Sequence, residues 1–452
     1  MNRLVFSRWF VLALIVLTSM DVSALTGAWR GDLSIGPSKL PIVFNFQHKD
    51  GALPGCTLDS PAQGAKGIPA EVTVCTADSV AVECRSIGAR FTGRISGDSI
   101  TGAFSQRGFS FPLVLTAEEP LSKRRPQTPS GPFPYSVKDT VFESADGTRL
   151  AGTLVLPAGM SAGAVPAVVM VSGSGPQNRD EELFEHRPFA VIADYLGRNG
   201  IASFRYDDRG TGLSEGDFVK SDIYNFKDDA RGAVDFLRTV PGLGRIGVLG
   251  HSEGGTIAFM LGADGVADFV VSLAGVAVTG KEVLMAQNIR SLEKAGTTGN
   301  DKVLSEKLLD SLFDICIGQY RSGSVRPVDI DSLAKAVAPG VPAAIVASAE
   351  ASQKVRMPSL DALLALEPAQ YMGSVSCPVL ALNGDRDTQV NAADNIAAIR
   401  RYIPHASTVI EPALNHMMQH CQTGDVSEYG TIRETIAPEV LDTVATFISS
   451  QK

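Results

Sequence analysis

The pattern of hydrophobic and polar positions divides this chain of 452 residues into distinct regions. Between residues 25 and 117, apolar and polar positions alternate in short runs, for example at 40–46 and 80–84, and turn signals such as Asp50-Gly51 separate the runs. Period-two alternation with frequent turns predicts antiparallel strands, so we expect a small all-β module, either a meander or a barrel. A structural or docking role and the recruitment of carbohydrate or substrate both stay open for it.

Residues 118–134 interrupt the alternation with five prolines. A proline-rich segment is extended and semi-rigid, and we interpret it as a linker between two domains. The basic run at residues 123–125 within it is expected to be a solvated charge run.

The pattern after residue 135 is typical of an α/β domain that extends to residue 452. Residues 136–143 and 149–156 flank Asp146-Gly147, a strong hairpin signal. Apolar runs then predict strands at 167–171, 201–206, 246–249, 268–273, 379–382 and 407–410, and amphipathic runs predict helices at 186–199, 222–239, 392–402 and 438–449. Such alternation indicates βαβ units and a mostly parallel sheet.

Long amphipathic stretches replace this rhythm between about residues 280 and 373. They predict helices at 283–294, 301–320, 329–338 and 359–366. Because the insertion falls between two predicted strands, we expect it to form a helical cap over the C-terminal edge of the sheet.

A serine motif lies at the junction of the strand 246–249 and the following helix. Gly250, Ser252 and Gly254 match G-x-S-x-G, the pattern of a nucleophile elbow on a sharp strand-to-helix turn. Ser214 sits in a second match, but no apolar strand precedes it and no helix start follows it. The context therefore favours Ser252 as the nucleophile and Ser214 as an ordinary loop serine.

A serine hydroxyl needs a base within hydrogen-bond reach and a carboxylate that orients the base. Asp387 follows the strand 379–382 and is our candidate for the carboxylate, while Asp385 more simply shapes the turn. His416 follows the next strand and is our candidate for the base, with His420 as its rival. For the oxyanion hole we predict the main-chain N–H groups of Glu253, directly after the nucleophile, and of Ser174, in the loop after the strand 167–171.

These motifs together resemble the serine α/β-hydrolase superfamily, and are most similar to bacterial exported esterases with an N-terminal β module. The resemblance is carried by Ser-Gly-Ser-Gly-Pro at 172–176, the stretch 206–216, Gly-His-Ser-Glu-Gly-Gly at 250–255, Gly-Asp-Arg-Asp at 384–387 and Leu-Asn-His at 414–416. It implies an α/β-hydrolase fold, with a mostly parallel eight-stranded sheet, helices on both faces and a cap. Ser172 replaces the histidine that opens this loop in many relatives.

The resemblance implies a serine esterase that cleaves carboxylic esters, with small acyl groups as the first expectation, through an acyl-enzyme. A peptidase or amidase of the prolyl oligopeptidase-like kind would keep the triad and change the bond, although the first module is too short for a propeller. A non-catalytic binding protein on a hydrolase scaffold is a third hypothesis, and it would not require all three triad residues. No cofactor and no metal are expected.

The N-terminal sequence, the net charge and the cysteines add predictions about the compartment and the partners of the protein. Arg3 and Arg8, the apolar run 9–17 and small residues before position 25 predict a signal peptide at 1–24, hence a periplasmic or secreted protein with no stable membrane span after cleavage. A formal charge of −9 argues against a nucleic-acid partner. Six cysteines, at 56, 75, 84, 316, 377 and 421, leave the disulfide pairing open, and a homodimer also stays open.

Overall fold

The computed structural model describes residues 25–35, 38–49, 52–60, 65–106, 108–118, 125–160, 165–354 and 356–451. The chain forms two compact units, divided between Arg124 and Arg125. The signal peptide predicted at 1–24 lies outside the described residues.

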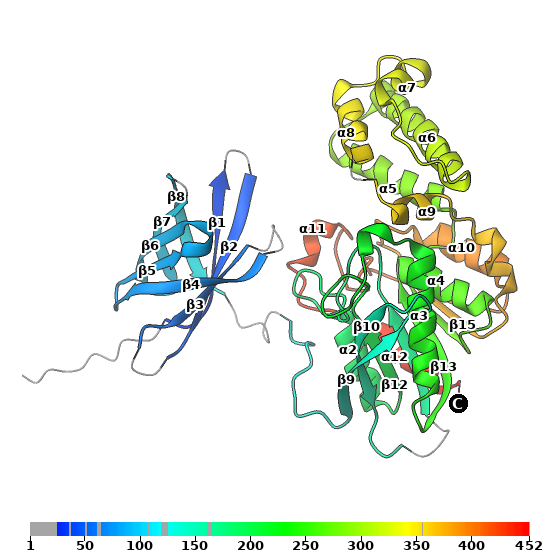
Figure 1. The fold of residues 1–452 in the computed structure, drawn as a ribbon, viewed down its shortest axis with the longest axis horizontal. Helices are drawn as coiled ribbons and strands as arrows, with labels where there is room; N and C mark the ends of the chain where they lie inside the picture. The colour runs from blue at the N-terminus through cyan, green and yellow to red at the C-terminus, as the bar shows by residue number, and fades with distance from the viewer. Residues whose placement is uncertain are drawn as a thin grey trace, which may run out of the picture. The chain divides into compact units, whose positions relative to one another are not determined.

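The first unit is a closed antiparallel barrel of eight strands (Figure 1). The strands are β1 (Gly27–Ile35), β2 (Ser38–Gln47), β3 (Gly55–Ser60), β4 (Ala65–Cys75), β5 (Ser79–Cys84), β6 (Ala89–Ser96), β7 (Ser99–Gln106) and β8 (Phe109–Ala117). Pairing of Trp29 with Ala117 closes β1 onto β8. The alternating pattern places one side of each strand inward, where Phe44, Phe91 and Leu115 are fully buried. The predicted small all-β module is therefore confirmed as a barrel with an apolar interior.

The second unit is built on an eight-stranded sheet with the order β16-β15-β14-β13-β11-β12-β10-β9. Its strands are β9 (Ser136–Glu143), β10 (Arg149–Leu156), β11 (Val165–Val171), β12 (Ala202–Tyr206), β13 (Leu243–His251), β14 (Val270–Leu273), β15 (Val379–Gly384) and β16 (Ser407–Glu411). The strands from β12 to β16 pair in parallel, and the hairpin β9–β10 adds antiparallel strands at one edge. The α/β-hydrolase fold is confirmed.

Helices cover both faces of this sheet and bury two hydrophobic clusters. On one face lie α3 (Ile223–Arg238), α4 (Glu253–Ala263) and α10 (Ala392–Tyr402), and on the other lie α2 (Pro188–Arg198) and α12 (Pro438–Ser449). The short α11 (Val426–Tyr429) precedes α12. Because both faces are covered, the parallel strands read as continuous apolar runs, which is why they could be found from the sequence.

The cap follows β14 and stands over the sheet end from which the β13–α4 turn emerges (Figure 1). It consists of α5 (Gly280–Lys294), α6 (Gly299–Arg321), α7 (Ile330–Val337), α8 (Ala343–Lys354) and α9 (Pro358–Leu364). The predicted helical cap is confirmed, but the prediction missed α8. Ala349 is the one buried residue of α8, so this alanine-rich helix carries no clear apolar stripe.

The structure also bears on the predictions for the linker and for the cysteines. The expectation of a solvated charge run at 123–125 is wrong for Arg125, which is 4% exposed and donates hydrogen bonds to the carbonyl oxygens of Phe184, Gly430 and Ile432. Residues 125–134 therefore belong to the second unit.

All six cysteines are free thiols. Within the described ranges, no helix is both long and apolar enough to cross a membrane.

Candidate active site

The turn between β13 and α4 has the geometry of a nucleophile elbow. Ser252 has φ 54° and ψ −118°, in a region that residues other than glycine seldom occupy. A Cβ added to Gly250 would come within 1.9 Å of the Gly254 carbonyl oxygen, and a Cβ on Gly254 would come within 2.1 Å of the Val171 oxygen. The two glycines are therefore required because strand, turn and helix nearly touch.

Asp387 and His416 are brought together from loops that follow two neighbouring strands, β15 and β16. The Nδ1 atom of His416 lies 2.7 Å from Oδ2 of Asp387, and both side chains are buried. The other oxygen of Asp387 accepts hydrogen bonds from the main-chain N–H groups of Gln389 and Val390, at 2.8 and 2.9 Å. The carboxylate is thus fixed, and it holds the imidazole with Nε2 available for another partner.

His416 is tied to the elbow through its neighbour, His251. The two imidazole rings lie with centroids 4.8 Å apart, and Nε2 of His251 donates to the main-chain oxygen of His416 at 2.9 Å. In the described part of the chain, neither the Ser252 hydroxyl nor Nε2 of His416 has a hydrogen-bond partner. Catalytic contacts of this kind are often loose without substrate and tighten when it binds.

The predicted oxyanion loop lies against the nucleophile. A Cβ added to Gly173 would sit 3.2 Å from Cβ of Ser252. Neither of the two predicted donors, the N–H groups of Ser174 and Glu253, has a hydrogen-bond partner among the described residues. Glu253 is the first residue of α4, where the helix dipole is positive. The Ser174 hydroxyl donates to Oε2 of Glu253 at 2.9 Å, which links the two residues that carry these donors.

Two buried carboxyl groups line this loop. Burial raises the pKa of Glu253 to about 6, and burial raises the pKa of Asp208 to about 8, against the lowering effect of hydrogen bonds from the Gln177 N–H and the Ser172 hydroxyl. Asp208 therefore holds its proton at neutral pH. The protonated Asp208 adds no negative charge to a site in which a negative oxygen would develop during the reaction.

The rival candidates have other partners. The Ser214 hydroxyl donates to the Asp207 carbonyl at 2.6 Å and accepts from the N–H of Ala151 at 2.9 Å, so it stabilises a loop. Asp385 accepts a hydrogen bond from the N–H of Ala413 at 2.6 Å and shapes the turn. His420 is exposed and lies between Glu434 and Glu439. None of these side chains joins the pair of Asp387 and His416.

One acidic residue at the site escaped the sequence reasoning. Glu181, in the loop between β11 and α2, accepts hydrogen bonds from the N–H of Gly173 and from His251, at 2.7 and 2.9 Å. It stands in the acidic stretch Asp180-Glu-Glu182, which has no periodicity that distinguishes one carboxylate from its neighbours. The role of His251 was equally hidden, since it fills a variable position of the serine motif.

Parts of this chain are similar to known proteins. Residues 185–306 match the family described as serine aminopeptidase, S33. Esterase EstD of Thermotoga maritima is 33% identical over 174 residues, which are 37% of this chain and 40% of EstD. These matches support the serine α/β-hydrolase superfamily for this chain.

Two solved structures are similar to this chain at low sequence identity and with TM-scores below 0.5. The hypothetical protein PA2218 of Pseudomonas aeruginosa is 17% identical, with a TM-score of 0.47 over 75% of this chain and 99% of its own. The Pyrococcus furiosus esterase Pf2001 is 15% identical, with a TM-score of 0.41 over 70% of this chain and 93% of its own. The match with the curated relative EstD, by contrast, spans only 40% of that relative's length.

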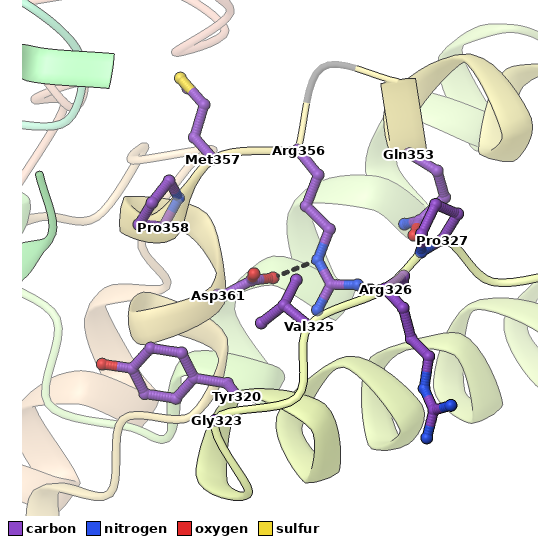
Figure 2. Close-up of a pocket in the computed structure, with 10 residues that line it drawn as sticks. All are labelled: Tyr320, Gly323, Val325, Arg326, Pro327, Gln353, Arg356, Met357, Pro358 and Asp361. Atoms are coloured by element: carbon purple, nitrogen blue, oxygen red, sulfur yellow. Dashed lines mark hydrogen bonds and ion pairs between the residues drawn. The ribbon is translucent and has the colours of Figure 1, made fainter. Parts of the chain in front are cut away.

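A separate cavity of about 540 Å³ lies in the cap of this hydrolase, between the end of α6 and the start of α9 (Figure 2). Its Arg356 donates from Nε to Asp361 at 2.6 Å and from Nη1 to Gln319 at 2.9 Å. The guanidinium is therefore already paired, and none of the lining residues is a predicted site residue. The residues that line this cavity include no serine, cysteine or histidine.

Proposed function

We infer that this protein is a serine esterase that cleaves carboxylic esters with the triad Ser252, His416 and Asp387. The observation that carries the inference is the buried pair of His416 and Asp387, joined at 2.7 Å and linked through His251 to the elbow serine. A buried Asp–His pair beside a strained, solvent-reachable serine is the arrangement that activates a hydroxyl. The similarity to EstD, an esterase, also supports an ester as the substrate.

The proposed reaction proceeds in two steps. His416 takes the Ser252 proton as the serine oxygen attacks the ester carbonyl, and the N–H groups of Ser174 and Glu253 stabilise the negative oxygen. Collapse of this intermediate breaks the bond to the alcohol, which leaves with the proton from His416. Water then gives a proton to His416 and attacks the acyl-enzyme, and the acid leaves as Ser252 recovers its proton. Short acyl chains are the proposed substrates, by analogy with related esterases.

A peptidase or amidase is the second candidate, favoured by the description of the matching family as serine aminopeptidase. The fold before the hydrolase domain argues against the prolyl oligopeptidase-like arrangement, because it is an eight-stranded barrel and no propeller. The same triad could cleave an ester or an amide bond, so an assay with both kinds of substrate is needed to distinguish the two activities.

One assay separates these activities. Purified protein is offered p-nitrophenyl acetate, p-nitrophenyl esters of long acids, and aminoacyl p-nitroanilides, with Ser252→Ala as the inactive variant and Ser214→Ala as the matched control. We expect turnover of the short ester that Ser252→Ala loses and Ser214→Ala keeps. Full activity of Ser252→Ala would overturn the proposal, and faster turnover of the anilides would favour the peptidase. No turnover at all, with no labelling of Ser252 by a phosphonate, would favour a non-catalytic binding protein.

We further propose that the protein is exported, on the basis of the predicted signal peptide. Expression of the full chain in a Gram-negative host, followed by fractionation and N-terminal sequencing, tests this. We expect a mature chain that begins at Leu25 in the periplasm or the medium. An uncleaved chain in the cytoplasm would contradict export.

A further inference from the structure

A short chain of hydrogen bonds joins three segments of the candidate site. Glu181 Oε1 accepts from the N–H of Gly173 at 2.7 Å and contacts Nδ1 of His251 at 2.9 Å. On the other side of the ring, Nε2 of His251 donates to the main-chain oxygen of His416 at 2.9 Å. The oxyanion loop, the elbow and the loop of the base are therefore connected through two side chains that take no part in the proposed chemistry.

This connection is closed off from solvent. Glu181 is 4% exposed and His251 is 7% exposed. The surroundings of the pair are mostly apolar, and they are formed by Phe189, Ile192, Leu273, Met418 and Ile436. An interaction between charges is much stronger in such a place than in water, and a lost partner is not replaced by solvent.

The hydrogen-bond partners of His251, together with its raised pKa, indicate the charge of the pair. A carbonyl oxygen only accepts, so Nε2 of His251 must carry a proton, and Glu181 Oε1 already accepts from Gly173. Burial by itself lowers the pKa of His251, but Glu181 outweighs it through its charge and its hydrogen bond, and raises the pKa to about 9. At neutral pH both ring nitrogens of His251 therefore donate, and the pair is an imidazolium with a carboxylate.

We propose that Glu181 and His251 are positioning residues of this hydrolase, a buried imidazolium–carboxylate pair that holds the oxyanion loop and the loop of His416 in register with Ser252. The inference rests on the proposed function, since it assigns these residues to the same reaction. Neither residue touches the substrate. They act by fixing the distance between the group that takes the proton and the groups that stabilise the oxyanion.

Three hydrogen bonds depend on the pair, and Glu181→Gln cannot keep all of them. With Glu181→Gln, a neutral His251 protonated on Nδ1 would lose its bond to the His416 carbonyl. If it were protonated on Nε2 instead, the glutamine would turn its NH₂ toward the ring and lose the N–H of Gly173. Either arrangement releases one of the two loops, although the side chain keeps its size and the fold keeps its packing.

The kinetic test compares Glu181→Gln with Glu182→Gln, a neighbouring glutamate that pairs with Arg187 instead. On the short p-nitrophenyl ester we expect kcat of Glu181→Gln to fall about 10- to 100-fold with KM within about twofold, because misplacement of catalytic groups slows the chemical step. Glu182→Gln should keep kcat within about twofold. An unchanged kcat for a folded Glu181→Gln would overturn the inference while leaving the proposed function intact.

A spectroscopic test covers the case in which a variant fails to fold or no substrate is found. Wild-type protein with ¹⁵N-labelled histidine is examined by NMR at neutral pH, and the His251 signals are assigned with His251→Asn. We expect both ring nitrogens of His251 to be protonated. A neutral His251 in an active enzyme would overturn the inference alone, whereas an imidazolium in a protein without hydrolase activity would refute the proposed function and the positioning role with it, and leave a structural pair.

Discussion

Replacing Glu253 by glutamine should stabilise this hydrolase, and only above a defined pH. Glu253 is 7% exposed, and burial raises its pKa from 4.5 to about 6. The protonated form is therefore preferred in the folded state, and ionisation above the folded pKa costs stability. A pKa difference of this size corresponds to about 2 kcal/mol. The penalty is absent below pH 4.5, develops between pH 4.5 and 6, and is constant above that.

Glutamine is neutral at every pH and nearly identical in shape. It also keeps an oxygen for the hydrogen bond that the Ser174 hydroxyl donates to Glu253. We therefore expect Glu253→Gln to raise the free energy of unfolding by about 2 kcal/mol at pH 8 and to change it little at pH 4.5.

The two units allow this to be measured in the intact protein. Every α-helix in the described part of the chain lies in the second unit, so circular dichroism at 222 nm during urea unfolding follows the hydrolase domain. Trp29 lies in the barrel core, and its fluorescence follows the first unit separately. Because the transitions are resolved by probe, the free energy of each can be extrapolated to water.

Glu350→Gln is the matched control, since Glu350 is exposed on α8 and has no ion-pair partner within the described ranges. It should leave the pH dependence of the 222 nm transition unchanged. The reasoning is refuted if Glu253→Gln has the same effect at pH 4.5 and pH 8, or if it destabilises the hydrolase domain at pH 8.

Three further predictions address the triad, the linker and the elbow. Asp387→Asn should lower kcat for the short ester about 10⁴-fold, because an amide no longer stabilises a charged His416, while the 222 nm signal stays native. Arg125→Ala should lower the free energy of unfolding of the hydrolase domain by about 3 kcal/mol, measured in urea, because a buried side chain that donates to three main-chain carbonyls is lost. Gly250→Ala should abolish the native 222 nm signal, since its Cβ would lie 1.9 Å from a carbonyl oxygen; native activity in that variant would contradict the elbow geometry.

The sequence was most informative where one local pattern determines one local structure. The hairpin strands 136–143 and 149–156 have the bounds predicted around Asp146-Gly147, because the turn type sets the register of both strands. The elbow was identified by its glycines together with the strand and helix on either side. The Ala-rich helix α8 was missed because burial of a single side chain leaves no period to detect.

The same distinction, between features set by a local pattern and features set by distant contacts, applies to the site residues and to Arg125. Residue chemistry and chain order were enough to select Ser252, Asp387 and His416, because a buried strand followed by a polar loop locates a side chain at the sheet edge. Arg125 was taken for a solvated residue, since its three acceptors lie 59 to 307 positions away in the chain. No local pattern contains such partners.

The sequence by itself determined the two-domain order, the parallel sheet, the cap and the candidate nucleophile. Each of these follows from the spacing of apolar residues along the chain or from glycines at a tight turn. Only the tertiary structure decided which of several acidic residues meets His251, and which carboxyl groups are buried beside the oxyanion loop. Those properties depend on burial and on contacts between distant segments, and the charge of a carboxyl group or an imidazole follows from its surroundings more than from its identity.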